Sequence, residues 1–491
     1  MMKKIAVIGS GFAGLSAAAC LAKQGFEVHV YEKNEQIGGR ATTWEKDGFR
    51  FDLGPSWYWM PEVFEQFFQK FGHTTSDFYK LKRLDPSYRV FFEQNQILDI
   101  PAQLSGLYEL FEEIQPGSSK GLKAFLDQAA IKYKVAMDKF VWMPGSKWSE
   151  LMKWEVVKYV PQLNMFGSVS DYVAQFAQDK RLQQILEFPV LFLGAKPSET
   201  PALYTMMNHA DLALGTWYPM GGMVKIPQAF EKICSEQGVV FHLNTPVEKI
   251  EVQHKKINGI RVNGEFYAFD AVVSGADYHH TETQLLPQEA QQYSEDYWET
   301  RKMAPSSLLY YIGVGKKVEN LKHHNLFFDT DFEPHANSIY KTKDWPQNPL
   351  FYVSVPSLTD PSIAPEGQEN IFILIPTAPG LDQTPEIEEK YFNLVMDRLE
   401  QATKQDIRSY ILFRRNFGCT DFKARYNSFK GNAYGLANTL LQTANLKPRM
   451  KSSKVKNLWY CGQLTVPGPG VPPAIISGQV VAQELAKSMG I

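Results

Sequence analysis

The chain has 491 residues, and its 51 Lys and Arg residues nearly balance its 53 Asp and Glu residues, for a formal net charge of −2 at pH 7. This balance argues against a nucleic-acid partner, because proteins that bind nucleic acids normally carry a basic excess or stripe. Hydrophobic residues make up 44% and charged residues 21%, which excludes disordered, collagen-like and coiled-coil chains. The length suits roughly three domains or two large ones.

The four cysteines are widely spaced and form neither a CxxC pair nor a cluster with histidines. This spacing argues against a disulfide framework and a zinc site, so we predict no metal and a reducing cytoplasm. The first residues resemble a signal peptide, but three glycines at a recognisable spacing argue against secretion. Beyond them, no apolar run reaches the length of about 18 residues that a membrane-spanning helix needs.

At the amino terminus the pattern predicts a strand at 5–8, a glycine turn, a helix at 15–24 and a second strand at 26–31 that ends at Glu32. This order is the context required of a dinucleotide-binding fingerprint. The helix start supplies free N–H groups for phosphates, and the Glu32 carboxylate can accept hydrogen bonds from ribose hydroxyls.

Each glycine of the turn has a mechanical role. Gly9 permits the tight turn, Gly11 lets the backbone approach the pyrophosphate, and Gly14 lets the helix pack closely on the strand. The runs Gly38-Gly39-Arg40 and Gly54-Pro55-Ser56 then favour FAD over NAD, because they allow another close backbone approach and add the Arg40 cation near the phosphates. The alternative is a hairpin loop with a solvated arginine.

Two later segments are expected to return to this site. Short strands at 238–243, 248–252, 257–262, 266–269 and 271–273 predict a small β-meander over a parallel sheet, with a purely structural role left open. Near the carboxyl end the pattern predicts a strand at 457–460, a rigid loop at 462–473 and a helix at 474–487. Gly468 and Gly470 allow this loop to lie flat against a planar ring, and the helix start favours negative charge on the pyrimidine half of a reduced flavin.

The chain resembles the phytoene desaturase family of the flavin amine oxidase superfamily over nearly its full length. The resemblance rests on the glycine box, FDLGPSWYWMP at 51–61, FPVLFLGAKPSETPALYTMM at 188–207, WYPMGGM at 217–223, VVSGAD at 272–277 and GQLTVPGPGVPPAIISG at 462–478. Val466 stands where the family often carries His, and Pro473 where a Gly is common. These departures leave the desaturation step open.

The resemblance implies an α/β, FAD-binding Rossmann-like fold of the glutathione-reductase type, with a β-meander and a discontinuous α+β substrate domain. We expect residues 1–75, 220–290 and 440–491 to form the FAD domain, and 76–219 and 291–439 the substrate domain with a membrane-associating helical part. The backbone at Val247 would touch the adenine side. The predicted cofactor-binding residues are Gly9, Gly11, Phe12, Ala13, Gly14, Glu32, Lys33, Gly39, Arg40, Gly54, Pro55, Ser56, Val247, Asp277, Gly462, Gly470, Val471 and Pro472.

Aromatic residues flank the family motifs and could line a dry tunnel for a polyene, although each of them is also an ordinary core residue. The predicted substrate-binding set is Trp57, Tyr58, Phe188, Tyr204, Trp217 and Tyr218. Helical stretches at 122–140 and 148–160, with tryptophans among lysines, suit either a membrane–water interface or an amphipathic helix on the core. His209 and Asp211 could handle a proton, but we assign no catalytic residue.

The resemblance implies an FAD-dependent oxidoreductase that introduces double bonds into phytoene, toward lycopene, by hydride transfer to the flavin. Oxygen or a quinone would reoxidise the flavin, and the protein would lie in the cytoplasm on the inner face of the cell membrane. The alternatives are a later carotenoid desaturase such as a hydroxycarotenoid 3,4-desaturase, an amine or porphyrinogen oxidase, and a lipid-binding protein on the same fold.

Overall fold

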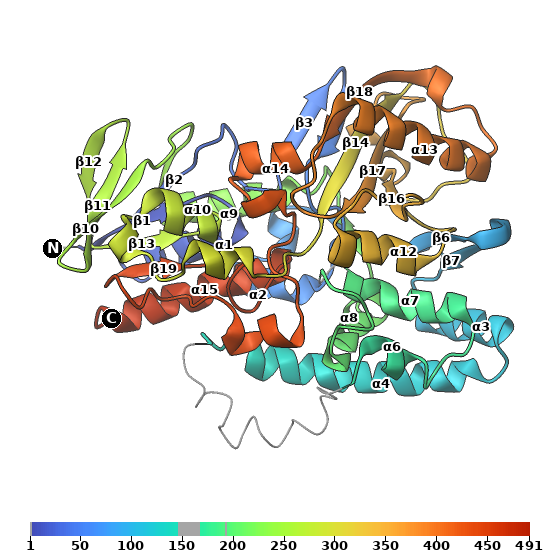
Figure 1. Cartoon of the computed structure of the whole chain (residues 1–491), viewed down its shortest axis with the longest axis horizontal. Helices are drawn as coiled ribbons and strands as arrows, with labels where there is room; N and C mark the ends of the chain where they lie inside the picture. The colour runs from blue at the N-terminus through green and yellow to red at the C-terminus, as the bar shows by residue number, and fades with distance from the viewer. Residues whose placement is uncertain (1, 146–166, 192–193) are drawn as a thin grey trace.

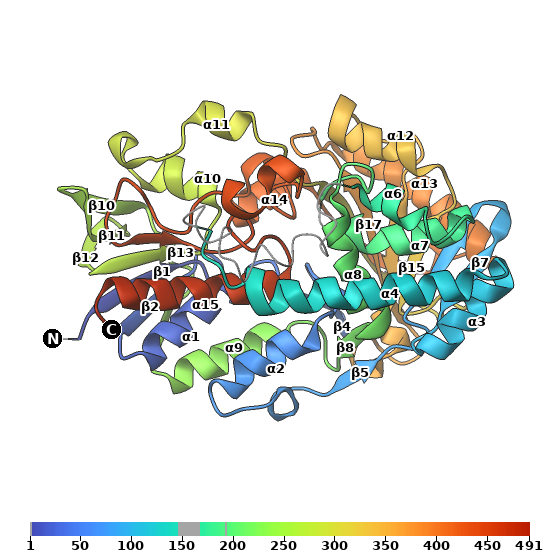
Figure 2. The same ribbon diagram turned by 90° about the horizontal axis from the view of Figure 1, so that it is seen from below.

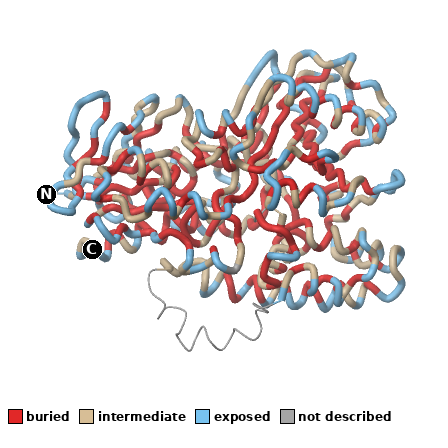
Figure 3. Tube along the Cα trace, in the orientation of Figure 1, coloured by how far each residue is buried: buried red, intermediate tan, exposed pale blue. Residues whose placement is uncertain are grey.

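A computed structural model describes residues 2–145, 167–191 and 194–491 of the chain. Its two largest sheets lie side by side, the parallel one at the left of Figure 1 and a mixed one at the right. Buried segments follow both sheets and the region where they meet (Figure 3). The main hydrophobic core runs through both parts of the molecule.

The parallel sheet collects strands from three distant regions of the chain, in the order β19-β13-β1-β2-β9. Its strands are β1 (Lys4–Ile8), β2 (Glu27–Tyr31), β9 (Val240–His242), β13 (Ala271–Ser274) and β19 (Leu458–Tyr460). All neighbours are parallel. Strands of a parallel sheet are buried on both faces, which is why a short apolar run such as that of β1 forms one. The predicted α/β fold class is confirmed, and the two chain ends meet in one sheet.

Helices cover this sheet: α1 (Phe12–Lys23), α2 (Pro61–Gln69), α9 (Lys225–Glu236) and α15 (Val471–Ser488). Figure 2 shows these four helices side by side. Two helix starts differ from the prediction. Helix α1 begins at Phe12 and α15 at Val471, so both begin directly after a glycine of the cofactor motifs. Pro472 and Pro473 occupy the first turn of α15, where a missing N–H costs no helical hydrogen bond.

The predicted strands at 238–243 and 271–273 are not part of the meander, because they join the parallel sheet as β9 and β13. The other three predicted strands form a small antiparallel meander beside that sheet. It consists of β10 (Lys249–Gln253), β11 (Lys256–Val262) and β12 (Glu265–Ala268). Apolar residues of β10 and β11 alternate with polar ones, and Ile250, Ile257 and Ile260 pack in the second core cluster with Tyr31 of β2. The meander is therefore fixed to the parallel sheet by one apolar face.

The mixed sheet has the order β18-β14-β17-β16-β15-β6-β7. Its strands are β6 (Tyr88–Phe92), β7 (Ile97–Ile100), β14 (Ser306–Val314), β15 (His324–Phe328), β16 (Phe351–Ser354), β17 (Glu369–Thr377) and β18 (Ile411–Phe417). Only β6 and β15 pair in parallel. Odd-numbered residues of β17, such as Ile373, pack on helix α13 (Pro385–Thr403), while Phe372 faces the main core. One face of this sheet therefore packs on α13, and the other faces the main core.

A helical layer lies below the mixed sheet in Figure 1. It contains α3 (Leu104–Ile114), α4 (Ser118–Val135), α6 (Val169–Val173), α7 (Lys180–Leu191) and α8 (Met206–Asn208). The remaining elements are α10 (Tyr278–His280), α11 (Glu295–Glu299), α12 (Phe332–Asn337), α14 (Cys419–Tyr426) and the strand pairs β3 (Thr43–Lys46) with β4 (Phe49–Asp52) and β5 (Leu81–Arg83) with β8 (Trp217–Pro219).

The helix predicted at 122–140 corresponds to α4 and a short π-helical continuation at Ala136–Phe140. The second tryptophan- and lysine-rich helix, predicted at 148–160, lies outside the described residues. Among the described helices, none combines the length and the apolar character needed to cross a bilayer. The domain boundaries given by the sequence stay predictions.

Candidate cofactor site

A cavity of about 510 Å³ lies between the parallel sheet and the mixed sheet. Most of the predicted cofactor residues line it: Gly9, Gly11, Phe12, Ala13, Glu32, Lys33, Gly39, Arg40, Gly54, Pro55, Val247, Asp277, Gly462, Gly470 and Val471. These residues come from both chain ends and from the returning middle segment. Gly14, Ser56 and Pro472 do not line this cavity, and Ser56 borders a separate pocket with Tyr218.

Two glycines permit close packing around the first turn. A Cβ atom on Gly14 would lie 2.1 Å from the carbonyl oxygen of Gly9, so this position tolerates no side chain without a backbone shift. Gly39 has a φ of +60°, and its Cβ would lie 3.0 Å from the Cα of Gly11. The Gly38-Gly39-Arg40 turn therefore packs directly on the glycine turn, and the two form one backbone-lined cradle.

Glu32 lines the cavity, but its carboxylate already accepts four hydrogen bonds from the protein. Its Oε2 accepts hydrogen bonds from the backbone N–H and the hydroxyl of Ser10, at 2.9 and 2.8 Å. Its Oε1 accepts from the backbone N–H and side-chain amide of Asn34, at 2.9 and 2.8 Å. An ionised carboxylate offers about four acceptor positions. A ribose hydroxyl must therefore share or replace one of these bonds.

Arg40 supplies an incompletely bonded cation at the cavity. Its Nη2 donates to the Ser428 hydroxyl at 3.3 Å, and its guanidinium lies 5.1 Å from the centroid of the Tyr426 ring. Within the described part of the chain, the Nε of Arg40 is buried without a partner. Burial lowers the pKa of Arg40, and the nearby Asp277 carboxylate opposes that shift. A buried N–H without an acceptor, in the cavity that the start of α1 also lines, fits a phosphate group.

Further parts of the lining come from residues that the sequence analysis did not select. Strands β14 and β17 contribute Ser307, Leu309, Phe372 and Leu374, and the segment from α14 onward contributes Phe422, Arg425, Tyr426, Asn427, Ala433 and Tyr434. The apolar runs at 306–314 and 369–377 are typical of buried strands. Their sequence gives no sign of the cavity, because it does not say which sheet lies opposite.

Helix α14 is fastened to the loop that follows β2. Lys33 Nζ donates to the Ala424 carbonyl at 2.8 Å, and the side chains of Arg425 and Glu35 form an ion pair at 2.9 Å. The backbone N–H of Phe429 donates to Asp277 at 3.3 Å. A segment predicted to belong to the substrate domain thus closes one side of the cofactor cavity.

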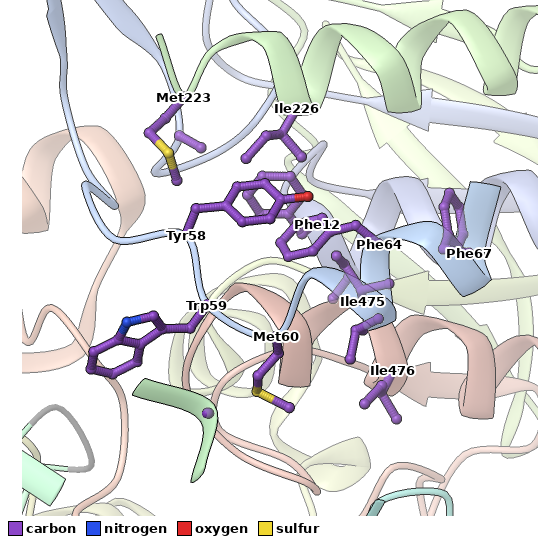
Figure 4. Packing of buried hydrophobic residues seen from close by; sticks show 14 of the residues in the cluster. Phe12, Tyr58, Trp59, Met60, Phe64, Phe67, Met223, Ile226, Ile475 and Ile476 are labelled. Carbon is purple, nitrogen blue, oxygen red and sulfur yellow. The ribbon is translucent and has the colours of Figure 1, made fainter. Parts of the chain in front are cut away.

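None of the six predicted substrate-binding aromatics lines this cavity. Trp57 stacks on His324, with ring centroids 4.0 Å apart, and Phe188 packs against Trp57 at 5.4 Å. Tyr58 is fully buried beside Phe64 in the packed cluster of Figure 4, and its hydroxyl lies 3.0 Å from that of Tyr79.

The other three aromatics have their own partners. Tyr204 bonds to the Thr443 hydroxyl at 2.7 Å, and the Trp217 indole donates to the Leu214 carbonyl at 3.0 Å. Tyr218 borders the small pocket that it shares with Ser56, whose volume is about 20 Å³. In this structure the six side chains are packed, and their role toward a substrate stays a prediction.

The profile of the family described as flavin containing amine oxidoreductase matches residues 12–486. The chain belongs to this family. It is therefore a flavin-dependent oxidoreductase, and its cofactor is FAD. The glycine cradle, the unpartnered Arg40 Nε and the starts of α1 and α15 fit the phosphates and the flexible chain of this cofactor.

Curated relatives extend over the whole chain. The carotenoid 3,4-desaturase of Haloarcula japonica is 41% identical over 486 residues, which cover 99% of this chain and 98% of the relative. The zeta-carotene-forming phytoene desaturase of Myxococcus xanthus is 33% identical, with coverage of 98% and 94%. A solved oxidoreductase from Methanosarcina mazei has a TM-score of 0.64 at 16% identity, and covers 99% of this chain and 100% of its own. The predicted family resemblance is confirmed.

Proposed function

We propose that the chain is an FAD-dependent carotenoid desaturase, which introduces carbon–carbon double bonds into a long apolar polyene. The observation that carries the proposal is the cavity wall formed by β14 and β17. Ser307, Leu309, Phe372 and Leu374 line it, and none of them is charged. A hydrocarbon offers no group for a hydrogen bond or an ion pair, so its binding energy comes from burial, at about 25 cal/mol per Å² of apolar surface.

The charged lining residues are found elsewhere in the cavity. Glu32, Lys33, Arg40 and Asp277 belong to the predicted cofactor-binding motifs, and Arg425 pairs with Glu35 beside them. An amine substrate would favour a carboxylate or an aromatic cage at the reacting end. The β14 and β17 residues offer no carboxylate and a single aromatic ring, that of Phe372, which favours a hydrocarbon over an amine. The names of the curated relatives point the same way.

Bound FAD supplies a hydride acceptor: one carbon of a CH–CH unit loses a hydride, its neighbour loses a proton, and the electron pair left behind forms the double bond. The chain contributes alignment and the exclusion of water. Leu309, Phe372 and Leu374 would hold the polyene against the cofactor, and the glycine cradle would hold the cofactor in place. Water or a weak base takes the proton, so we assign no catalytic residue.

The proposal also covers the substrate of the desaturation step, membrane contact and the electron acceptor. We favour phytoene as the substrate, with a later step on a hydroxylated carotenoid as the alternative. Contact with the inner face of the membrane and reoxidation by oxygen or a quinone also belong to the proposal. Leu441 and Leu446, 76% and 40% exposed, are apolar side chains that a lipid surface would bury.

The test is expression in a host that makes phytoene and, separately, in one that makes a hydroxylated acyclic carotenoid. We expect a yellow purified protein and, by chromatography, products with more conjugated double bonds in one of the two hosts. A protein that carries flavin but leaves both substrates unchanged would contradict the proposal. Release of hydrogen peroxide with amines would support an amine oxidase, and a flavin-free protein would support the lipid-binding alternative.

A further inference from the structure

Lys447 is a buried basic side chain with no anion beside it among the described residues. Lys447 is 4% exposed, and its Nζ has no hydrogen-bond partner in the part of the chain that the structure describes. Burial lowers the pKa of Lys447 to about 7, and no charged group contributes to the shift. An ammonium in this setting is costly, since both its solvation and its ion pairing are missing.

A second unpartnered polar atom lies beside it. The side-chain oxygen of Asn438, a residue 2% exposed, is also buried and has no partner among the residues that the structure describes. Both groups approach Gly468: a Cβ atom there would lie 3.5 Å from Lys447 Nζ and 3.7 Å from Asn438 Oδ1. Two neighbouring, fully buried polar atoms without partners indicate a missing polar ligand better than either atom alone.

Gly468 belongs to the loop between β19 and α15, which the sequence predicts as the floor of the flavin. Both ends of this loop line the cofactor cavity, with Gly462 at one end and Gly470 and Val471 at the other. Gly468, Lys447 and Asn438 do not line it, so the two side chains lie behind the loop and would act on the cavity through it. The FAD of this family is a polar ligand for that cavity. The pyrimidine half of its flavin has carbonyl oxygens and gains negative charge on reduction. Charge placed near this half of the ring is a recognised means of tuning a flavin.

We propose that the Lys447 ammonium, with Asn438 beside it, is the positive charge that stabilises the reduced flavin from the side of the 462–470 loop. Lys447 would act on the cofactor electrostatically and would not exchange a proton or hydride with the substrate. The inference rests on the bound flavin and not on the polyene of the proposed function, so the two can fail separately.

The test is the midpoint potential of the bound flavin in the purified holoprotein, measured against a reference dye at pH 6, where Lys447 is protonated. Lys447→Met removes the charge with little change of volume. We expect its reduction equilibrium to fall about tenfold, which corresponds to about 30 mV for a two-electron couple. Lys447→Arg keeps the charge and should retain most of the wild-type potential.

Two further variants make the result decisive. Asn438→Asp places a carboxylate beside the ammonium, so it should lower the potential even if Lys447→Met fails to fold. Lys132→Met is the matched control, because Lys132 is also a buried lysine but its Nζ donates to the Ala202 carbonyl and the Thr205 hydroxyl at 3.2 and 3.1 Å. Unchanged or raised potentials in flavin-loaded Lys447→Met or Asn438→Asp would overturn the inference, as would an equal fall in Lys132→Met.

Discussion

At the scale of single residues, the absence of a side chain at Gly14 allows the nucleotide-binding turn to form. Its missing Cβ leaves room for the Gly9 carbonyl oxygen, which would otherwise lie at 2.1 Å. Real Cβ contacts do not reach such a distance, so the turn and the start of α1 must separate if a side chain is added. The same turn presents Gly9 and Gly11 to the cofactor cavity.

We therefore expect Gly14→Ala to reduce the FAD content of the purified protein by at least about tenfold, because the displaced turn no longer matches the pyrophosphate. The flavin-to-protein absorbance ratio measures this. Gly167→Ala is the matched control, since a Cβ there meets no described residue within 4 Å. Full flavin content in Gly14→Ala would show that the turn adapts and that this packing is not needed.

Asp211 is the other residue whose surroundings make a clear prediction. It is fully buried and accepts hydrogen bonds from the Tyr88 hydroxyl at 2.9 Å and the Thr216 hydroxyl at 3.4 Å, and no cation of the described residues pairs with it. Burial raises the pKa of Asp211 from 3.8 to about 7. The folded state therefore holds its proton more tightly than the unfolded state, and stability is lost as the pH rises from about 4 to about 7.

Asp211→Asn removes this titration. Relative to wild type, the variant should gain on the order of 2–4 kcal/mol in stability between pH 4 and pH 8. Melting temperatures of both proteins across this range provide the measurement, with Asp127→Asn as the control because its carboxylate is exposed. A constant difference between Asp211→Asn and wild type at all pH values would contradict the raised pKa.

At the scale of secondary-structure elements, the pairing of α1 with α15 joins the two ends of the chain beneath the cofactor. The Ser16 hydroxyl donates to the Ile475 carbonyl at 2.8 Å, and a Cβ on Gly478 would lie 2.2 Å from the Ala13 carbonyl oxygen. Backbone contact this close is possible only with glycine. Because α1 and α15 both begin at cavity glycines, their packing fixes the relative position of the two cofactor motifs.

Gly478→Val should force the two helices apart. We expect a loss of about 1–3 kcal/mol or more from overpacking, together with reduced FAD content because Gly11 and Gly470 separate. Calorimetry and flavin absorbance give the two readouts. Gln483→Val introduces the same side chain at an exposed position of α15 and should change neither. A normal melting temperature and flavin content in Gly478→Val would contradict the proposed coupling.

At the scale of the whole molecule, the cofactor cavity exists because two sheets from different parts of the chain face one another. The parallel sheet and its loops supply the charged and glycine-rich side, and the mixed sheet supplies the apolar side. The segment 419–434 joins them and is tied to the β2 loop by Lys33. The reacting half of the flavin is therefore expected where the two sheets meet, and not within the packed cluster around Trp57.

Leu374→Glu places a carboxylate on the apolar wall and should lower desaturation at least about tenfold while FAD remains bound, since the hydrocarbon would have to bury a charge. Chromatography of the carotenoids and the flavin absorbance measure the two effects. Leu412→Glu, on the exposed side of β18 in the same sheet, is the control and should desaturate normally. Wild-type desaturation by Leu374→Glu would mean that the polyene binds elsewhere.

Local patterns in the sequence were sufficient to predict the nucleotide-binding half. Strands β1, β2, β13 and β19, the meander and the glycine turns all follow from short-range rules, because apolar runs, turn residues and helix starts act within a few residues of one another. The order of these segments also carried the family resemblance that the comparisons confirm.

The tertiary structure alone decided which residues share the cavity. Phe372 and Tyr434 gave no signal of their own, since a buried strand or loop residue looks the same whether it faces a helix or a cofactor. The isolation of Lys447 is equally invisible in the sequence, because an unpaired charge is defined by what the rest of the chain fails to bring near it. Local chemistry determined the elements of this protein, and the packing of distant segments determined its site.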